Sequence, residues 1–299
     1  MSIDKIREVA HPLLVSTGAL AAVGAALELR IAGATVSPEL EVRLREVLRI
    51  LGIDGEVQGV STEALAALLA EIRATFLQEV KLLYSSTLQP GWTHTEAELL
   101  QSRGQASAAL APMFQRVVVP RLDGLAVRLE AATASFLDVG VGVAALSIAM
   151  ARHWPALRVV GIDLWEPALA LARQNVAAAG LGERIELRQQ AVEELADTAE
   201  FDLIWFPTPF IRADRLASAL QHVWRALRPG GWILFGTMNR AGEPLAAALA
   251  DLRSISWGGQ PLLPSEGQAL LEESSFEQVQ VLASPPWAAA ALVVGRRPL

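Results

Sequence analysis

Two acidic residues and two glycines form the clearest chemical pattern in this sequence of 299 residues. Asp138 follows the apolar residues Phe136-Leu137 and is itself followed by Gly140 and Gly142. A helical pattern then runs from Leu146 to Ala151, so the order predicts a strand, a tight turn and a helix. Glycine at both positions lets the backbone turn sharply and lets a ligand approach the main chain closely. The helix would direct its free amide groups into the turn.

Two classes of cofactor use a turn of this kind. Gly140-x-Gly142-x-x-Ala145 matches the dinucleotide fingerprint loosely. S-adenosylmethionine (SAM) has no pyrophosphate and carries a sulfonium and an ammonium, for which Asp138 supplies a nearby negative charge. Asp163 ends the next apolar run, 25 residues after Asp138 (163 minus 138), near the interval at which an acid meets ribose hydroxyls. A turn without any ligand is the alternative, and the agreement of both acids with the turn favours a SAM site.

Three segments resemble motifs of class I SAM-dependent methyltransferases, in the order in which that family has them. Asp138–Gly142 resembles the glycine-rich motif, and Val160–Leu169 resembles the acidic motif of the second strand. Leu227–Phe235 resembles the Leu-x-Pro-Gly-Gly turn before the fifth strand. Ala144 departs from the pattern, since many members have a third glycine there. The resemblance covers about residues 136 to 235 and implies SAM as the cofactor and S-adenosylhomocysteine as its product.

Composition excludes several classes of function. The net charge of −7, with scattered arginines, argues against a nucleic-acid substrate, which would need clustered Lys and Arg. The chain has no cysteine, and no His or carboxylate pair stands at ligand spacing, so neither disulfides nor a metal site are predicted.

The uncharged run from Leu13 to Leu27 is interrupted at its onset by Pro12 and is too short to span a bilayer. It predicts a buried helix and no membrane association. An enzyme that uses SAM is also expected to be cytoplasmic, because SAM is made in the cytosol.

The expected fold is α/β: a Rossmann-like, seven-stranded methyltransferase sheet with an N-terminal, mostly α-helical domain. Residues 131–299 alternate strands and helices, which implies a parallel sheet covered on both faces. The last two strands, 276–282 and 289–295, read as an antiparallel hairpin. Residues 1–130 resemble in arrangement the helical dimerisation and acceptor-binding domain of many small-molecule methyltransferases. That resemblance implies a homodimer formed through the N-terminal helices.

Ligands of open α/β sheets lie beyond the carboxyl ends of the strands, and this rule selects the cofactor residues. By resemblance, Asp163 would hold the ribose hydroxyls, Leu164 or Trp165 would flank the adenine, and Ala191 and Val192 would lie near its edge. For each apolar residue, plain core packing is an equal alternative. The predicted cofactor-binding residues are Asp138, Val139, Gly140, Gly142, Asp163, Leu164, Trp165, Ala191, Val192, Trp205 and Phe206.

Aromatic residues in predicted turns and at strand ends suggest a flat, apolar acceptor. The predicted substrate-binding residues are Trp92, Pro207, Phe210 and Trp287. His94 and Tyr84 are the catalytic candidates, with an ordinary surface histidine as the alternative for His94. Plant-type O-methyltransferases, which this arrangement resembles, place a His just after strand four, where this chain has none. Methylation of an electron-rich carbon, as in an indole, therefore stays open beside O- and N-methylation.

The predicted function is methyl transfer from SAM to a small aromatic acceptor of specialised metabolism. Three alternatives remain beside it. The chain could methylate a peptide, or it could be a non-catalytic SAM-fold binding or partner protein. An NAD-linked oxidoreductase is disfavoured by Asp138 before the turn and by Pro229-Gly230-Gly231.

Overall fold

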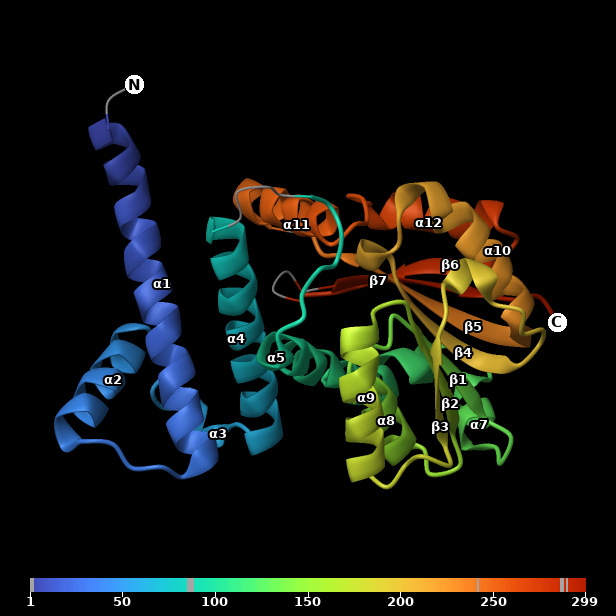
Figure 1. Ribbon diagram of the computed structural model, residues 1–299, viewed down its shortest axis with the longest axis horizontal. Coiled ribbons are helices and arrows are strands. Elements are labelled where there is room, and N and C mark those ends of the chain that lie inside the picture. The colour runs from blue at the N-terminus through green and yellow to red at the C-terminus, as the bar shows by residue number, and fades with distance from the viewer. Residues whose placement is uncertain (1–2, 85–88, 241, 286–287, 289) are drawn as a thin grey trace. The chain divides into compact units, whose positions relative to one another are not determined.

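The computed structural model describes residues 3–84, 89–240, 242–285, 288 and 290–299. It divides into two compact units, Met1–Tyr84 and Ser85–Leu299 (Figure 1). The helices between Ser85 and residue 130 therefore belong to the unit that holds the sheet, not to the first helical unit. As a division of function, the boundary predicted at residue 130 stays a prediction.

The first unit is helical, as expected from the spacing of its apolar residues. Its helices are α1 (Ile3–Ala32), α2 (Pro38–Ile50), α3 (Glu56–Gly59) and α4 (Thr62–Tyr84). The Ser37 hydroxyl accepts the Leu40 amide at 3.3 Å, with Pro38 in the first helical position, which explains where α2 begins. Leu27 of α1 packs in a small core with Leu65 and Leu69 of α4.

Helix α1 corrects the prediction of a buried, short apolar segment. It continues for 30 residues with Pro12 inside it, and only Gly24 and Leu27 are buried. Leu13 and Leu14 are 54% and 69% exposed. By length and composition alone, α1 is the one helix in the described part of the chain that could cross a membrane. Signal sequences and core helices of soluble proteins also have this length and composition. The absence of a membrane role stays a prediction.

The second unit is built on a seven-stranded sheet in the order β3-β2-β1-β4-β5-β7-β6. The strands are β1 (Ser135–Val139), β2 (Arg158–Asp163), β3 (Ile185–Gln189), β4 (Phe201–Pro207), β5 (Leu227–Met238), β6 (Glu277–Leu282) and β7 (Ala290–Arg296). The pairs from β3 to β5 are parallel, and β7 runs antiparallel to both β5 and β6. This confirms the predicted sheet and its closing antiparallel pair.

Helices cover both faces of the sheet (Figure 1). The α-helices of this unit are α5 (Ala97–Ala108), α6 (Leu110–Met113), α7 (Leu125–Glu130), α8 (Ala145–His153), α9 (Glu166–Ala178), α10 (Leu216–Ala226), α11 (Pro244–Ser256) and α12 (Pro264–Glu273). Short helical turns are η1 (Phe114–Val118), η2 (Val119–Arg121), η3 (Val192–Glu194), η4 (Thr208–Phe210) and η5 (Ala213–Arg215).

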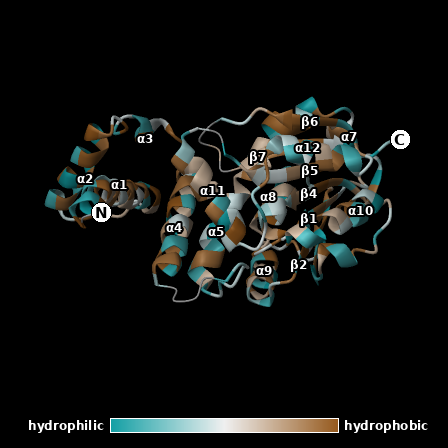
Figure 2. Ribbon diagram, turned by 90° about the horizontal axis from the view of Figure 1, so that it is seen from above, coloured by the Kyte–Doolittle hydropathy of each residue, from teal (hydrophilic) through white to brown (hydrophobic). Residues whose placement is uncertain are grey.

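The strand residues alternate between two buried clusters, one on each face of the sheet. Phe136 and Leu203 pack with residues of α8 and α9, whereas Leu137 and Ile204 pack with residues of α10 and α12. Helix α10 buries Leu216, Ala219, Leu220, Val223 and Ala226, the spacing of one helical face. Figure 2 shows hydrophilic and hydrophobic residues side by side on this helix, as expected when one face is buried.

The third sequence motif has a structural role at the amino ends of the central strands. Asp202 of β4 is 3% exposed and accepts hydrogen bonds from Arg128 at 3.2 Å, Arg228 at 2.7 Å and the Ser135 amide at 3.1 Å. Arg128 also donates to the Pro229 carbonyl at 2.8 Å. A Cβ atom at Gly230 would lie 2.7 Å from the Arg128 guanidinium, so the glycine leaves room for this network.

Candidate functional site

The glycine turn joins β1 to α8, as the sequence predicted. Gly140 and Gly142 have φ angles of +69° and +56°, a region that residues with a side chain rarely adopt. The amides of Gly140 and Val141 donate to the Ile162 carbonyl at 2.9 and 3.0 Å, which fixes the turn against the end of β2. No atom lies closer than 3.8 Å to the position of a Cβ at either glycine, so the backbone of the turn is open to a ligand.

Ala144, the residue that departs from the family motif, also has a positive φ angle, of +63°. It is the residue directly before α8 and is fully buried. The left-handed conformation costs a residue with a Cβ roughly 1–2 kcal/mol. Many members of the methyltransferase family that the motif resembles have a third glycine here. The positive φ angle at this position explains that glycine better than a shortage of space for a side chain does.

Asp163 binds the turn directly. Its Oδ2 accepts the Gly142 amide at 2.8 Å, and its Oδ1 accepts the Trp165 amide at 2.8 Å. Burial raises the pKa of this carboxyl, while the amides of Trp165 and Gly142 act in the opposite direction. Each carboxylate oxygen has a second lone pair, so the group keeps the capacity to accept two further hydrogen bonds, as a ribose diol requires.

Asp138 is the more deeply buried of the two acids, at 2% exposure. The hydroxyl of Ser147, in α8, donates to its Oδ2 at 2.7 Å. Burial raises the pKa of Asp138 to about 7, the bond from Ser147 opposes this shift, and the nearby Asp163 adds to it. Ser147 was not predicted as part of the site, since only the helical turn brings it back over the strand end.

The residues predicted around an adenine differ in how far they are exposed. Leu164 is 64% exposed, an unusual position for a large apolar side chain beside a buried acid. Ala191 and Val192, at the start of η3, are 7% and 4% exposed. Trp165 is partly buried and, like Trp92, packs against the buried cluster of Leu100, Val143 and Ala168. This placement favours Leu164 as the residue that would flank an adenine.

Three predicted cofactor residues have their side chains in the core, the alternative that the sequence had left open. Val139 and Phe206 are 2% and 0% exposed, and Phe206 stacks on Phe235 with 5.7 Å between the ring centroids. Trp205 lies on the opposite face of the sheet, 5.5 Å from Phe114 and against Gly236. Their burial explains these side chains without a ligand.

Four rings form what we call the aromatic cluster: Trp92, His94, Phe210 and Trp257. Trp92 lies 4.7 Å from His94, 5.4 Å from Phe210 and 6.0 Å from Trp257, each with an edge-to-face geometry. Phe210 stacks on Trp257 at 5.0 Å with an angle of 3° between the planes. The Arg103 guanidinium lies 4.4 Å from the Trp257 ring centroid. Phe210 keeps 37% of its surface exposed, so the cluster has an accessible side.

The aromatic cluster is assembled from segments far apart in the sequence. The Gly91 amide donates to the Ser256 carbonyl at 3.1 Å, which holds the loop of Trp92 and His94 at the end of α11. Phe210 ends η4, directly after β4. The sequence placed Trp92, His94 and Phe210 near the acceptor. Trp257 was among the tryptophans expected in turns or at strand ends, but neither its contact with Phe210 nor Arg103 was predicted, because no local motif links these residues.

The structure does not test two of the predicted residues. Tyr84 ends α4 in the first unit and is 80% exposed, and its catalytic role stays a prediction. Trp287 lies outside the described residues. In the part of the chain that the structure describes, no group of three or more His, Asp or Glu side chains could hold a metal ion.

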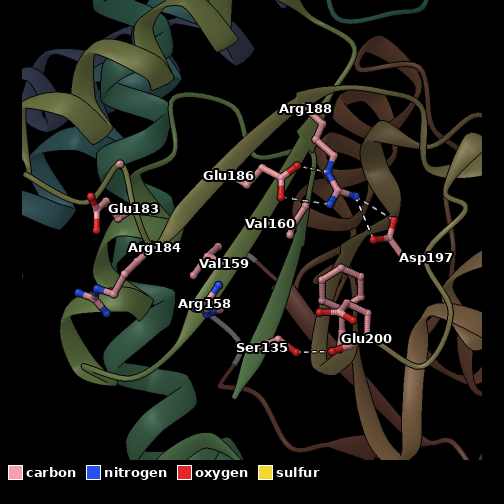
Figure 3. A pocket seen from close by; sticks show the side chains of 12 residues that line it. Ser135, Arg158, Val159, Val160, Glu183, Arg184, Glu186, Arg188, Asp197 and Glu200 are labelled. Carbon is pink, nitrogen blue, oxygen red and sulfur yellow. Dashed lines mark hydrogen bonds and ion pairs between the residues drawn. The ribbon is translucent and has the colours of Figure 1, made fainter. Parts of the chain in front are cut away.

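A charged pocket of about 210 Å³ lies at the amino ends of the parallel strands, away from the glycine turn (Figure 3). It is lined by Ser135, Arg158, Val159, Val160, Gly182, Glu183, Arg184, Glu186, Arg188, Asp197, Glu200 and Phe201. Arg188 binds Glu186 at 2.7 Å and Asp197 at 2.9 Å (Figure 3), so its charge is satisfied within the protein. This pairing indicates a structural role.

Comparison with known proteins supports the domain and the fold. Residues 136–231 match the family model described as Methyltransferase domain. The ubiquinone biosynthesis O-methyltransferase of Paracidovorax citrulli is 36% identical over 121 residues, which cover 40% of this chain and 50% of that protein. The release factor glutamine methyltransferase of Cereibacter sphaeroides is 36% identical over 125 residues, covering 38% and 42%. The chain thus spans about half the length of such relatives, or less.

Solved structures share the architecture over nearly the whole chain. The SAM-dependent methyltransferase SibL in its apo form has a TM-score of 0.61 at 21% identity, covering 98% of this chain and 100% of that chain. Human N-acetylserotonin methyltransferase in complex with SAM has a TM-score of 0.60 at 16% identity, covering 98% of both chains. Identities this low show the fold alone. Residues 136–231 therefore form a methyltransferase domain, and the fold is that of SAM-dependent methyltransferases.

Proposed function

We propose that this protein transfers a methyl group from SAM to a small aromatic acceptor. One observation carries the proposal: the cofactor turn and the aromatic cluster are adjacent. The ring of Pro207, at the end of β4, lies 3.8 Å from the position of a Cβ at Gly140, and Phe210 follows three residues later. A molecule stacked on the cluster would therefore lie beside a ligand of the turn.

The residues at the turn fit SAM. Asp163 has hydrogen-bonding capacity left for a ribose diol, Leu164 offers an exposed apolar surface for an adenine, and Asp138 supplies negative charge for a cation. When bound, this cofactor would supply an electrophilic methyl group on a sulfonium. The acceptor's proton would be removed by a base or by solvent. The work of the protein is then to align the acceptor and to exclude water.

The aromatic cluster supports a flat, apolar acceptor such as an indole or a phenol, held by stacking and buried area. His94 is the titratable member of the cluster and is our candidate for the base that an oxygen acceptor would need. An electron-rich ring carbon would not need a strong base. Methylation of carbon, oxygen or nitrogen therefore stays open within the proposal.

The experiment is an acceptor screen with the purified protein and SAM, in which indoles and phenols are followed by mass for the gain of one methyl. For any acceptor found, Phe210→Ala should raise KM at least about fivefold, because it removes a stacking partner worth roughly 1 kcal/mol or more. Val127→Ala, which changes an exposed apolar residue of α7, serves as the matched control and should leave KM unchanged. SAM binding without any methylated product would instead favour a peptide substrate or a non-catalytic protein.

The pKa of Asp138 predicts how cofactor binding depends on pH. The carboxyl is protonated below about pH 7 and gains its negative charge as the pH rises through that value. A cationic ligand favours the charged form, so SAM affinity should rise between about pH 6 and pH 8 and then level off. Asp138→Asn should weaken binding and abolish this pH dependence, as measured by calorimetry at each pH. A pH dependence that survives in this variant would contradict the assignment.

We also propose that the protein is cytoplasmic and that two copies pair through their N-terminal helices. Helix α1 exposes Ile6, Leu13, Leu14 and Val15, all at least 51% accessible, and a partner would remove this apolar surface from water. Sedimentation of the purified protein tests this, and a monomer at micromolar concentration would contradict it.

A further inference from the structure

Trp165 makes hydrogen bonds in two directions, and each leads to a different part of the site. Its backbone amide donates to Asp163 Oδ1 at 2.8 Å, so it helps to hold the acid that would bind the ribose. Its indole Nε1 donates to the His94 carbonyl at 2.6 Å, so it also holds the loop of the aromatic cluster. One residue thus links the cofactor acid to the acceptor side.

The indole ring is fixed between these two bonds. It is partly buried and packs against Leu100, Val143 and Ala168, the buried cluster that Trp92 also packs against. Val143 belongs to the segment between the glycine turn and α8, and Leu100 lies in α5. A ring held on several sides cannot rotate independently of the glycine turn and of the loop that carries His94. A displacement of the Trp165 backbone is therefore transmitted to the loop through the indole N–H.

The His94 carbonyl is close to the aromatic rings that would meet the acceptor. The His94 ring lies 4.7 Å from Trp92, and Trp92 contacts both Phe210 and Trp257. A change in the position of residue 94 therefore changes the geometry of the aromatic cluster.

We infer that Trp165 is a positioning residue that couples occupancy of the cofactor site to the order of the loop carrying Trp92 and His94. This inference rests on the proposed function, because it takes SAM or its product as the ligand of the turn. Binding at Asp163 would fix the backbone of Trp165, and the indole N–H would then fix the loop. The acceptor side would be completed only when the cofactor is present.

The test is amide hydrogen exchange with and without saturating S-adenosylhomocysteine, followed in peptides that cover residues 91–98 and 140–146. In the wild-type protein the ligand should slow exchange in both segments. Trp165→Phe keeps an aromatic ring but removes the N–H. In this variant the 140–146 segment should keep its protection, while protection of 91–98 should fall about fivefold, the factor that corresponds to one net hydrogen bond.

Gln101→Leu is the matched control, because it removes a different bond, between the two helices that follow His94 and Trp165. Gln101 of α5 exchanges hydrogen bonds with Asn175 of α9 at 3.1 and 3.2 Å and does not touch the bond between Trp165 and His94. Loop protection in this variant should match the wild type. A general loosening of α5 would lower protection in both variants.

Two results would overturn the inference, and a third would overturn the proposed function on which it rests. The coupling is absent if ligand protects the amides of residues 91–98 from exchange as strongly in Trp165→Phe as in the wild type. It is also absent if ligand binds the wild type without slowing exchange in residues 91–98. Failure of the wild type to bind S-adenosylhomocysteine at all would instead remove the proposed function. If Trp165→Phe does not fold, Trp165→Leu, which also lacks the N–H, replaces it, and the wild-type comparison still decides whether ligand binding reaches the loop.

Discussion

Replacement of Asp163 by Ala is expected to lower the affinity for SAM by more than a hundredfold. Without the carboxylate, the complex would lose two charge-assisted hydrogen bonds to the ribose, each worth about 1.5–3 kcal/mol. A factor of ten in affinity corresponds to about 1.4 kcal/mol, so the two bonds together account for more than a hundredfold. The variant would also free the amides of Gly142 and Trp165, which the carboxylate now holds at 2.8 Å each. Calorimetric titration with SAM measures the change.

Two further variants separate these contributions. Asp163→Asn keeps the size of the side chain and one oxygen acceptor, so its loss should be smaller than that of Asp163→Ala. Glu166→Ala is the control, because Glu166 is a nearby acid whose side chain is 50% exposed and paired with Arg173 on the surface. It should bind SAM as the wild type does. Unchanged affinity in Asp163→Ala would show that this acid is not a cofactor residue.

Replacement of Asp202 by Ala is expected to lower the free energy of unfolding by about 3 kcal/mol. Removal of one partner from a buried ion pair costs about 3–5 kcal/mol, because the remaining charge is left without its counter-charge. The Asp202 side chain is 5% exposed, while those of Arg128 and Arg228 are 28% and 27% exposed, so water can solvate the arginines in part. We therefore place the effect at the lower end of that range.

Urea unfolding of the purified protein measures this loss. Asp214→Ala is the matched control, since Asp214 also pairs with an arginine, Arg212 at 3.0 Å, but has a side chain that is 57% exposed. An exposed pair contributes about 1 kcal/mol or less. Equal losses in the two variants would contradict the structural role that we assign to the Asp202 network.

The parts of the site that the sequence predicted are those fixed by local backbone geometry. Gly140 and Gly142 are needed where φ is positive, and Asp163 ends the next strand, at a distance from the turn set by one strand–helix–strand unit. Such constraints act over short stretches of chain, so they leave a readable pattern. The predicted sheet followed in the same way from the alternation of strands and helices.

The parts that the sequence did not predict depend on contacts between distant segments. Every residue of β4 is buried, so its composition could not show whether the side chains of Trp205 and Phe206 pack in the core or contact a cofactor. Trp257 and Arg103 come together only because α5 and the end of α11 meet in the fold. For α1, the apolar run predicted burial, but only Gly24 and Leu27 are buried. The run by itself does not show which surface the helix packs against.

The most direct test of the central claim is calorimetric titration of the purified protein with SAM and, separately, with S-adenosylhomocysteine. The arrangement of Asp138, Asp163 and the glycine turn predicts that both bind at one site per chain with micromolar affinity. Binding of neither would contradict the assignment of the turn as a cofactor site, and with it the proposed methyl transfer.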